Sequence, residues 1–259
     1  MKTLVVRILK ISVMALAVLV IAVVGLFAVT FMGRKKITDG LEINGVHVVR
    51  DSIVTACVIP IGPGRVALID TGNDKSGKAI LTELKREGLG PEAVKAILLT
   101  HGHRDHIGAV PLFRKAEVMI LTADIELAEG RAGSRGPVQQ LFPPHPTGVR
   151  VNRPLRDGDI VKLGRVTVRV YSISGHTEGS AAFLVNGVLI MGDSADATRA
   201  GKLTGAPWLF SDNQSQNRES LVRLGQRLVK EKAVVKALVF SHSGALIEGL
   251  TPLTAFKGE

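Results

Sequence analysis

Cysteine and aromatic residues are scarce in this chain of 259 residues. The one cysteine, Cys57, lies in the apolar run Ile53 to Ile61, where a small core residue is expected. A single cysteine excludes an intrachain disulfide and is compatible with either an oxidising or a reducing compartment. Aromatic side chains make up 4% of the composition, which leaves little material for stacking on nucleic-acid bases.

A large charge excess is also lacking outside the N-terminal segment. The formal net charge is +10, but six basic residues flank an apolar run near the N-terminus, which leaves only +4 over residues 37–259. Such a modest surplus does not indicate a nucleic-acid-binding groove. We therefore expect a small-molecule substrate and no nucleic-acid partner.

Residues 11–32 contain no charged side chain. As a helix this run would be about 33 Å long, enough to cross a bilayer core of roughly 30 Å. A cleavable signal peptide would have an apolar core of about 7–15 residues and a small-residue cleavage site, and Phe27 to Thr30 is a poor site. A soluble core helix is not normally apolar on every face. We therefore predict an uncleaved signal anchor over residues 1–36 and a catalytic domain over residues 37–259.

The orientation of this single-pass anchor is less constrained by the sequence. Three basic residues precede the apolar run and three follow it, so the positive-inside count does not favour either orientation. Long folded domains can translocate whatever their charge. We expect the domain on the outer, periplasmic or extracellular, side. Contact of Arg34–Lys36 with anionic headgroups on the inner face is the alternative.

The remaining 223 residues are enough for one domain with a large core. Strands followed by helices, twice over, predict two packed sheets with helices outside. The predicted strands are Val46–Arg50, Ile53–Ile59, Arg65–Asp70, Ala96–Thr100, Val118–Leu121, Ile160–Leu163, Val166–Ile173, Ala181–Val185, Val188–Met191 and Lys236–Phe240. The predicted helices are Lys75–Glu87, Gly108–Arg114, Ala123–Glu129 and Gln216–Lys232.

Residues 101–106, His-Gly-His-Arg-Asp-His, hold three of the chain's seven histidines and one carboxylate, directly after a predicted buried strand. Residues two apart on an extended segment point to the same side, so His101 and His103 can reach one metal ion together. Asp105 and His106 would face a second position nearby. Imidazole and carboxylate ligands suit zinc, and also iron or manganese.

Further candidate ligands lie just past the ends of other predicted strands, and glycines beside them permit tight turns. Loops after strand ends are where α/β enzymes place their chemistry. These candidates are His176, Asp193 and His242.

Together these segments resemble the metallo-β-lactamase-fold hydrolases. The resemblance covers roughly residues 41–247 and rests on Leu68–Gly72, Thr100–Gly108, Gly175–Thr177, Gly192–Asp193 and Ser241–Gly244. It implies an α/β fold, a four-layer αββα sandwich with a metal site at one edge, preceded here by the N-terminal transmembrane helix. No ligand position is missing, which favours a dinuclear branch similar to glyoxalase II and the lactonases.

The resemblance also implies a role for each candidate ligand. One metal ion would be held by His101, His103 and His176. The second would be held by Asp105, His106 and His242, with Asp193 bridging the two. Asp70 is similar to a carboxylate that orients the ligands from behind them. Two zinc ions are expected, with iron or manganese as alternatives.

Two metal ions on the order of 3.5–4 Å apart can share a hydroxide that stays ionised near neutral pH. It would attack a small carbonyl substrate, a thioester, lactone or related ester, with Asp105 and Asp193 as catalytic residues and Asp105 also as a proton carrier. Alternatives within the same fold are a phosphodiesterase or nuclease and a zinc β-lactamase-like amide hydrolase. The short connection between His176 and Asp193 leaves no room for a large nuclease insert.

Two segments without clear elements, residues 130–156 and 195–215, are expected to wall the substrate pocket. Trp208 and Phe210 are an apolar pair in the second segment and are candidates for that pocket. Contact with the membrane interface and core packing are the alternatives for this pair. His145, between two prolines, is expected to be an exposed loop residue, and His47, on a strand, a structural one.

Overall fold

The computed structural model describes residues 2–258. The chain divides into two compact units, with the boundary in the sequence between Arg34 and Lys35. The first unit consists of helix α1 (Lys2–Phe31). Its stretch Lys10–Phe31 is long and apolar enough to cross a membrane, and none of that stretch is buried. Such a helix near an N-terminus is typical of a membrane anchor or of a signal sequence.

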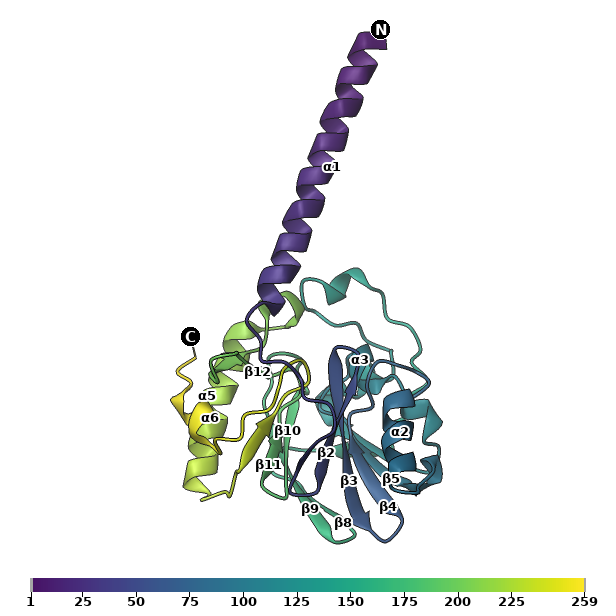
Figure 1. Cartoon of the computed structure of the whole chain (residues 1–259), viewed down its shortest axis with the longest axis vertical. Helices are drawn as coiled ribbons and strands as arrows, with labels where there is room; N and C mark the ends of the chain where they lie inside the picture. The colour runs from purple at the N-terminus through teal and green to yellow at the C-terminus, as the bar shows by residue number, and fades with distance from the viewer. Residues whose placement is uncertain (1, 259) are drawn as a thin grey trace. The chain divides into compact units, whose positions relative to one another are not determined.

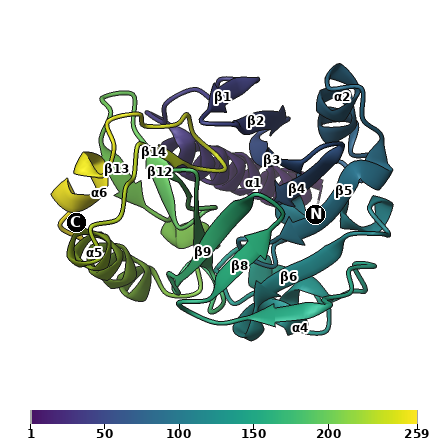
Figure 2. The same cartoon turned by 90° about the horizontal axis from the view of Figure 1, so that it is seen from below.

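In the second unit, two β-sheets pack face to face with helices on their outer faces (Figures 1 and 2). Within residues 35–258, the first sheet has the order β1-β2-β3-β4-β5-β6-β7 and the second the order β14-β11-β10-β9-β8. The first sheet comprises β1 (Leu41–Ile43), β2 (Val46–Asp51), β3 (Val54–Gly62), β4 (Arg65–Ile69), β5 (Val94–Leu98), β6 (Glu117–Leu121) and β7 (Arg153–Leu155). The second comprises β8 (Ile160–Leu163), β9 (Val166–Ser172), β10 (Ala181–Val185), β11 (Val188–Ile190) and β14 (Ala237–Val239).

Both faces of the central strands are buried, which explains why these strands are continuous apolar runs. In β4, Ala67 and Ile69 point into the core between the two sheets, whereas Val66 and Leu68 point to the outer face. The inner core contains residues of both sheets, such as Phe183 of β10.

The outer faces are covered by helices, which gives the predicted αββα sandwich. Over the first sheet lie α2 (Lys78–Arg86), α3 (Arg104–Ile107) and α4 (Ile125–Ala128). Over the second lie α5 (Gln214–Lys230) and α6 (Thr251–Ala255). In α5, Leu221, Leu224 and Leu228 pack into the second outer core and form the stripe expected of an amphipathic helix.

Two expectations about local structure were wrong. The helix predicted over Gly108–Arg114 is a 3₁₀ turn at Val110–Leu112, because Pro111 lacks the backbone donor that a longer helix needs. The segment 195–215 contains a hairpin of β12 (Ala195–Ala197) and β13 (Leu203–Gly205). Strands of three residues are too short to show a periodic pattern.

Parallel pairing brings distant segments to one edge of the sandwich. Because β4, β5 and β6 are parallel, the residues that follow them emerge at the same edge of the first sheet. In the second sheet β11 and β14 are also parallel, so Asp193 and His242 leave their strands side by side.

Candidate metal centre

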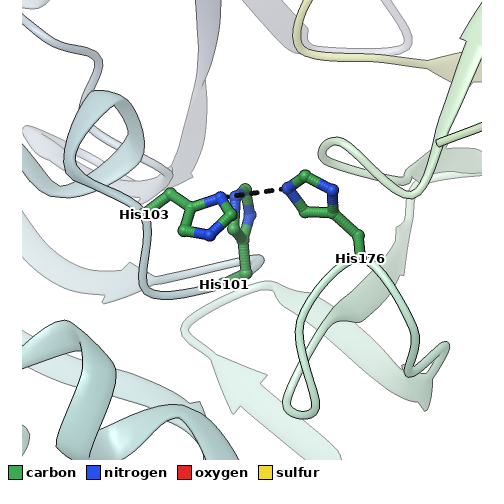
Figure 3. A group of neighbouring side chains, drawn as sticks. All are labelled: His101, His103 and His176. Carbon is green, nitrogen blue, oxygen red and sulfur yellow. Dashed lines mark hydrogen bonds between the residues drawn. The ribbon is translucent and has the colours of Figure 1, made fainter. Parts of the chain in front are cut away.

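Three histidines from two loops form the first group of side chains at this edge. His101 and His103 follow β5, and His176 follows β9. All three are buried, and one nitrogen from each lies within 4.8 Å of the others. The three imidazoles gather at a common point (Figure 3), where Nδ1 of His103 lies 3.0 Å from Nε2 of His176.

A second group contains two histidines and two carboxylates. Asp105 and His106 lie on α3. This single helical turn, Arg104–Ile107, begins inside the six-residue histidine motif. Asp193 and His242 follow β11 and β14. Nε2 of His242 lies 3.2 Å from Oδ2 of Asp105 and 3.1 Å from Oδ2 of Asp193. One donor atom from each of the four residues lies within 4.8 Å of the others.

Asp193 lies between the two groups. Its Oδ2 is 3.6 Å from Nε2 of His176 in the first group, and its Oδ1 is 3.2 Å from Nε2 of His106 in the second. The structure therefore brings together all seven side chains predicted as ligands, with Asp193 between the two groups.

In each of the five histidines of the two groups, one ring nitrogen contacts a group outside the centre. The other ring nitrogen is turned toward the centre. Such outer contacts fix the orientation of a ligating imidazole. These contacts join His101 Nδ1 to Thr100 Oγ1 (3.1 Å), His103 Nε2 to Ser134 Oγ (2.9 Å), His106 Nδ1 to Asp70 Oδ2 (2.8 Å), His176 Nδ1 to Ser211 Oγ (3.2 Å) and His242 Nδ1 to the carbonyl of Ile53 (2.8 Å).

The inward-facing atoms fit a bound cation. Among the described residues, Nε2 of His101, Nε2 of His106 and Oδ1 of Asp193 are buried without a partner in hydrogen-bond geometry. Leaving buried polar atoms unpaired is costly, so they call for an explanation. Imidazole and carboxylate donors converging from several loops are those that hold zinc in proteins.

The two groups differ in electrostatics. In the first, burial lowers the pKa of His176 to about 3, with further lowering by His103, and also lowers the pKa of His101. In the second, burial opposes protonation of His242, but Asp193 and Asp105 outweigh it and raise its pKa to about 10. The same carboxylates, with Asp70, raise the pKa of His106 despite its burial. The histidines of the first group are therefore neutral near pH 7, and His106 and His242 of the second group are protonated.

Asp70, predicted to orient the ligands, contacts the second group through Nδ1 of His106. Its carboxylate accepts hydrogen bonds from the backbone N–H and the hydroxyl of Thr100, both at 2.7 Å, in addition to its contact with His106. Asp70 has a φ of 58°, a left-handed conformation unusual for a residue other than glycine. This turn after β4 aims the carboxylate at two segments that carry the centre.

Asp124 supports the first group, and the sequence analysis missed it. Its buried carboxylate accepts hydrogen bonds from the backbone N–H of Gly102 (2.8 Å), the hydroxyl of Thr177 (2.8 Å) and the backbone N–H of Gly179 (2.7 Å). It thus joins the loop of His101 and His103 to the loop of His176. An acidic residue shortly after the predicted strand Val118–Leu121 was the available signal.

Gly102 permits this close contact between segments. A Cβ atom at position 102 would lie 2.7 Å from the backbone nitrogen of Ala128, closer than real side chains approach. The glycine between His101 and His103 is therefore explained by the approach of α4.

A cavity of about 240 Å³ opens beside the centre. Its lining includes His103 and Asp105 on one side and residues of the segment 130–147 on the other, among them Phe142 and His145. Nδ1 of His145 lies 2.5 Å from a guanidinium nitrogen of Arg104. The first of the two irregular segments walls this cavity, whereas Trp208 and Phe210 do not line it. His47 lies away from the cavity and contacts Glu83 at 2.9 Å.

Comparison with known proteins agrees with this geometry. The profile of the Metallo-beta-lactamase superfamily matches residues 50–230, so the chain belongs to that family. A hydroxyacylglutathione hydrolase of Xanthomonas euvesicatoria pv. vesicatoria is 31% identical over 163 residues, which are 62% of this chain and 51% of the relative. One of Vibrio cholerae is 31% identical over 137 residues, 53% of this chain and 45% of the relative. The chain thus spans about half the length of these curated relatives.

Solved structures share the fold. A metallo-beta-lactamase family protein from Thermus thermophilus matches with a TM-score of 0.59 and 25% identity, over 82% of this chain and 77% of that one. BJP-1, a subclass B3 metallo-beta-lactamase of Bradyrhizobium japonicum, matches with a TM-score of 0.56 and 20% identity, over 82% and 80% of the two chains. Family membership and the names of these relatives support the prediction of an enzyme.

Proposed function

We propose that this chain is a metal-dependent hydrolase that uses two metal ions to cleave a small carbonyl substrate: a thioester, lactone or related ester. The observation that carries this proposal is the convergence of two groups of donor side chains on buried atoms: Nε2 of His101 has no hydrogen-bond partner, and Nε2 of His106 faces Oδ1 of Asp193 at 3.2 Å. The name of the curated relatives, hydroxyacylglutathione hydrolase, favours a thioester.

The donor set favours zinc at both positions. One ion would be held by His101, His103 and His176 and the second by Asp105, His106 and His242, with Asp193 shared between them. The first group offers three imidazole nitrogens and the second two imidazoles and two carboxylates, a donor set that suits zinc better than magnesium or calcium.

When bound, the ions would lower the pKa of water and polarise the substrate carbonyl. The chain's own residues would hold the ions and transfer the proton. Asp105 both lines the cavity and contacts His242, so its Oδ2 is placed to hold a proton or to pass one to a leaving group. Asp193 would keep the two ligand groups together.

Metal analysis of the full chain, coupled to a hydrolysis panel, tests the proposal. We expect about two zinc ions per chain, loss of hydrolysis on chelation and recovery on adding zinc back. The panel includes a thioester, a lactone, a phosphodiester and a β-lactam. A stoichiometry near one would contradict the second position, and undiminished turnover after complete metal removal would contradict the mechanism. Turnover of only the phosphodiester or only the β-lactam would favour that activity instead.

We also propose that α1 stays attached as a single-pass anchor with the domain on the outer side of the membrane. The length and exposure of Lys10–Phe31 support this proposal. The mass of the purified protein tests cleavage, because an intact chain retains the N-terminal helix. A reporter fused to the C-terminus tests orientation, since a reporter active only on the inner side would reverse the assignment.

A further inference from the structure

Three large apolar side chains are exposed on two loops that contact histidines of the candidate metal centre. They are Leu141 (74% exposed), Phe142 (56%) and Trp208 (49%), and we call them the apolar rim. Phe142 also lines the cavity next to His103 and Asp105. Exposed apolar groups on neighbouring loops are typical of a surface that meets a membrane or another macromolecule.

The two loops that carry the apolar rim are joined to each other. The backbone N–H of Val138 donates to the carbonyl of Leu209 at 3.1 Å, and the backbone N–H of Arg135 donates to Asp212 at 2.8 Å. The apolar rim is therefore one surface built from two segments far apart in sequence.

The same loops also hold ligands of the candidate centre. Ser134, in the first loop, contacts Nε2 of His103, and Ser211, in the second, contacts Nδ1 of His176. The apolar rim therefore lies on the same two loops that hold His103 and His176 in place.

The chain enters the globular unit at this same edge. Lys35, its first residue, donates its backbone N–H to Ala197 and accepts one from Gly244, which lies two residues after His242. Its ammonium group also donates to the carbonyl of Ala245 at 2.8 Å. Within this unit, the entering segment and the long connection between α4 and β7 lie at the same end (Figure 1).

Covalent geometry then links this edge to the membrane. Only four peptide units separate Phe31, the end of α1, from Lys35, so the two residues are at most about 14 Å apart in any arrangement of the two units. If α1 spans a bilayer, Lys35 therefore lies close to the bilayer surface.

We propose that the apolar rim rests on the bilayer surface and that the substrate is a membrane-borne acyl ester or thioester whose acyl chain enters the cavity there. This inference rests on the proposed hydrolase function and on the proposed anchor. Tryptophan favours the membrane–water interface, and the cavity offers the apolar side chains of Leu127, Phe142 and Pro144 to an acyl chain.

The single tryptophan of the chain makes the rim directly observable. In full chain reconstituted into phosphatidylcholine vesicles, Trp208 emission should shift to the blue relative to the denatured protein and be quenched by brominated lipids. The matched control is the double variant Trp208→Phe, Val234→Trp. Val234 is 69% exposed and precedes β14, at the end of that strand away from His242, so its tryptophan should remain unquenched.

Unquenched Trp208 in reconstituted protein would overturn the proposal. Unquenched Trp208 together with concentration-dependent energy transfer between labelled chains would instead assign the rim to a second copy of the chain. Quenching does not depend on turnover, so this measurement stands even if the proposed hydrolase function fails.

Activity provides a second test. Leu141→Ser should lower the ratio of turnover on a long-chain acyl ester in vesicles to turnover on a short-chain soluble ester by about tenfold, since burial of one leucine is lost. Val234 is an apolar residue away from the centre, and its exposure is similar to that of Leu141. Val234→Ser should leave the ratio unchanged. An unchanged ratio in Leu141→Ser would contradict the membrane role of the rim. Lack of turnover on both esters in the unmodified chain would contradict the hydrolase proposal and the proposed substrate, but not the bilayer contact that the quenching measures.

Discussion

Asp193 places a carboxylate oxygen 3.1 Å from Nε2 of His242, and the same oxygen lies 3.6 Å from Nε2 of His176. His242 belongs to one group of donors and His176 to the other. A single side chain therefore connects the two groups, because the loops that follow β9, β11 and β14 meet around it.

Replacing Asp193 should disable the centre. We expect Asp193→Ala to lower kcat/KM by at least about 100-fold, since the shared carboxylate would be missing from both positions. Plasma mass spectrometry should show fewer than two metal ions per chain. Asp157→Asn, which alters an exposed carboxylate paired with Arg227, is the control and should retain both metal and activity. An Asp193→Ala protein with full metal and full activity would contradict the assignment.

Asp70 is expected to act through His106. In Asp70→Asn the amide can still accept a hydrogen bond from Nδ1 of His106, but the negative charge that favours this orientation is lost. Loss of such an outer partner typically costs about 10- to 100-fold in metal affinity. Competition with a chromogenic chelator would measure this change. Asp74→Asn, at a partly exposed carboxylate outside both groups of donors, should bind metal as the unmodified chain does.

Asp124 should matter for stability as well as for the centre. Asp124→Ala would leave the backbone donors of Gly102 and Gly179 unpaired, and each unpaired buried donor costs about 1–3 kcal/mol, whereas the hydroxyl of Thr177 could still bond to Ser180. We expect unfolding in urea at a clearly lower concentration, together with weaker metal binding, because the two histidine loops are no longer joined. Asp124→Asn should recover part of both. Equal midpoints for all three proteins would show that Asp124 does not join the loops.

The edge of the sandwich that holds the centre was predictable because its ligands follow strands with strong apolar patterns. β5 and β11 lie almost where the sequence places them, and the residues after them do meet. The helix within the histidine motif was not predictable, because the four residues Arg104–Ile107 are too few to show a period of 3.6.

The sequence predicted that residues 130–156 wall the pocket, but it did not predict how this segment packs. The segment 130–147 has no regular periodicity, so its sequence does not indicate what it packs against. Its position depends on single contacts such as Ser134 with His103 and Arg135 with Asp212. These contacts join residues that are 31 and 77 positions apart in sequence, so no local pattern indicates them. The same reasoning applies to Asp124, whose partners lie 22 to 55 residues away in sequence.

The two groups should bind metal with different pH dependence. In the metal-free protein, His176 has a pKa of about 3 and the pKa of His101 is also lowered, so the first group carries no proton that a metal ion must displace near pH 7. His242 has a pKa of about 10 and that of His106 is raised, so the second group holds about two protons there.

Metal binding to the second group should therefore release about two protons, and its affinity should rise steeply as the pH increases from about 6 toward about 9. Binding to the first group should change little over this range. Titration calorimetry at several pH values, in buffers of different ionisation enthalpy, counts the protons released with each equivalent of zinc. Asp70→Asn should reduce the count for the second equivalent, because one carboxylate that favours protonated His106 is neutralised. Equal proton release for both equivalents would contradict the electrostatic difference between the groups.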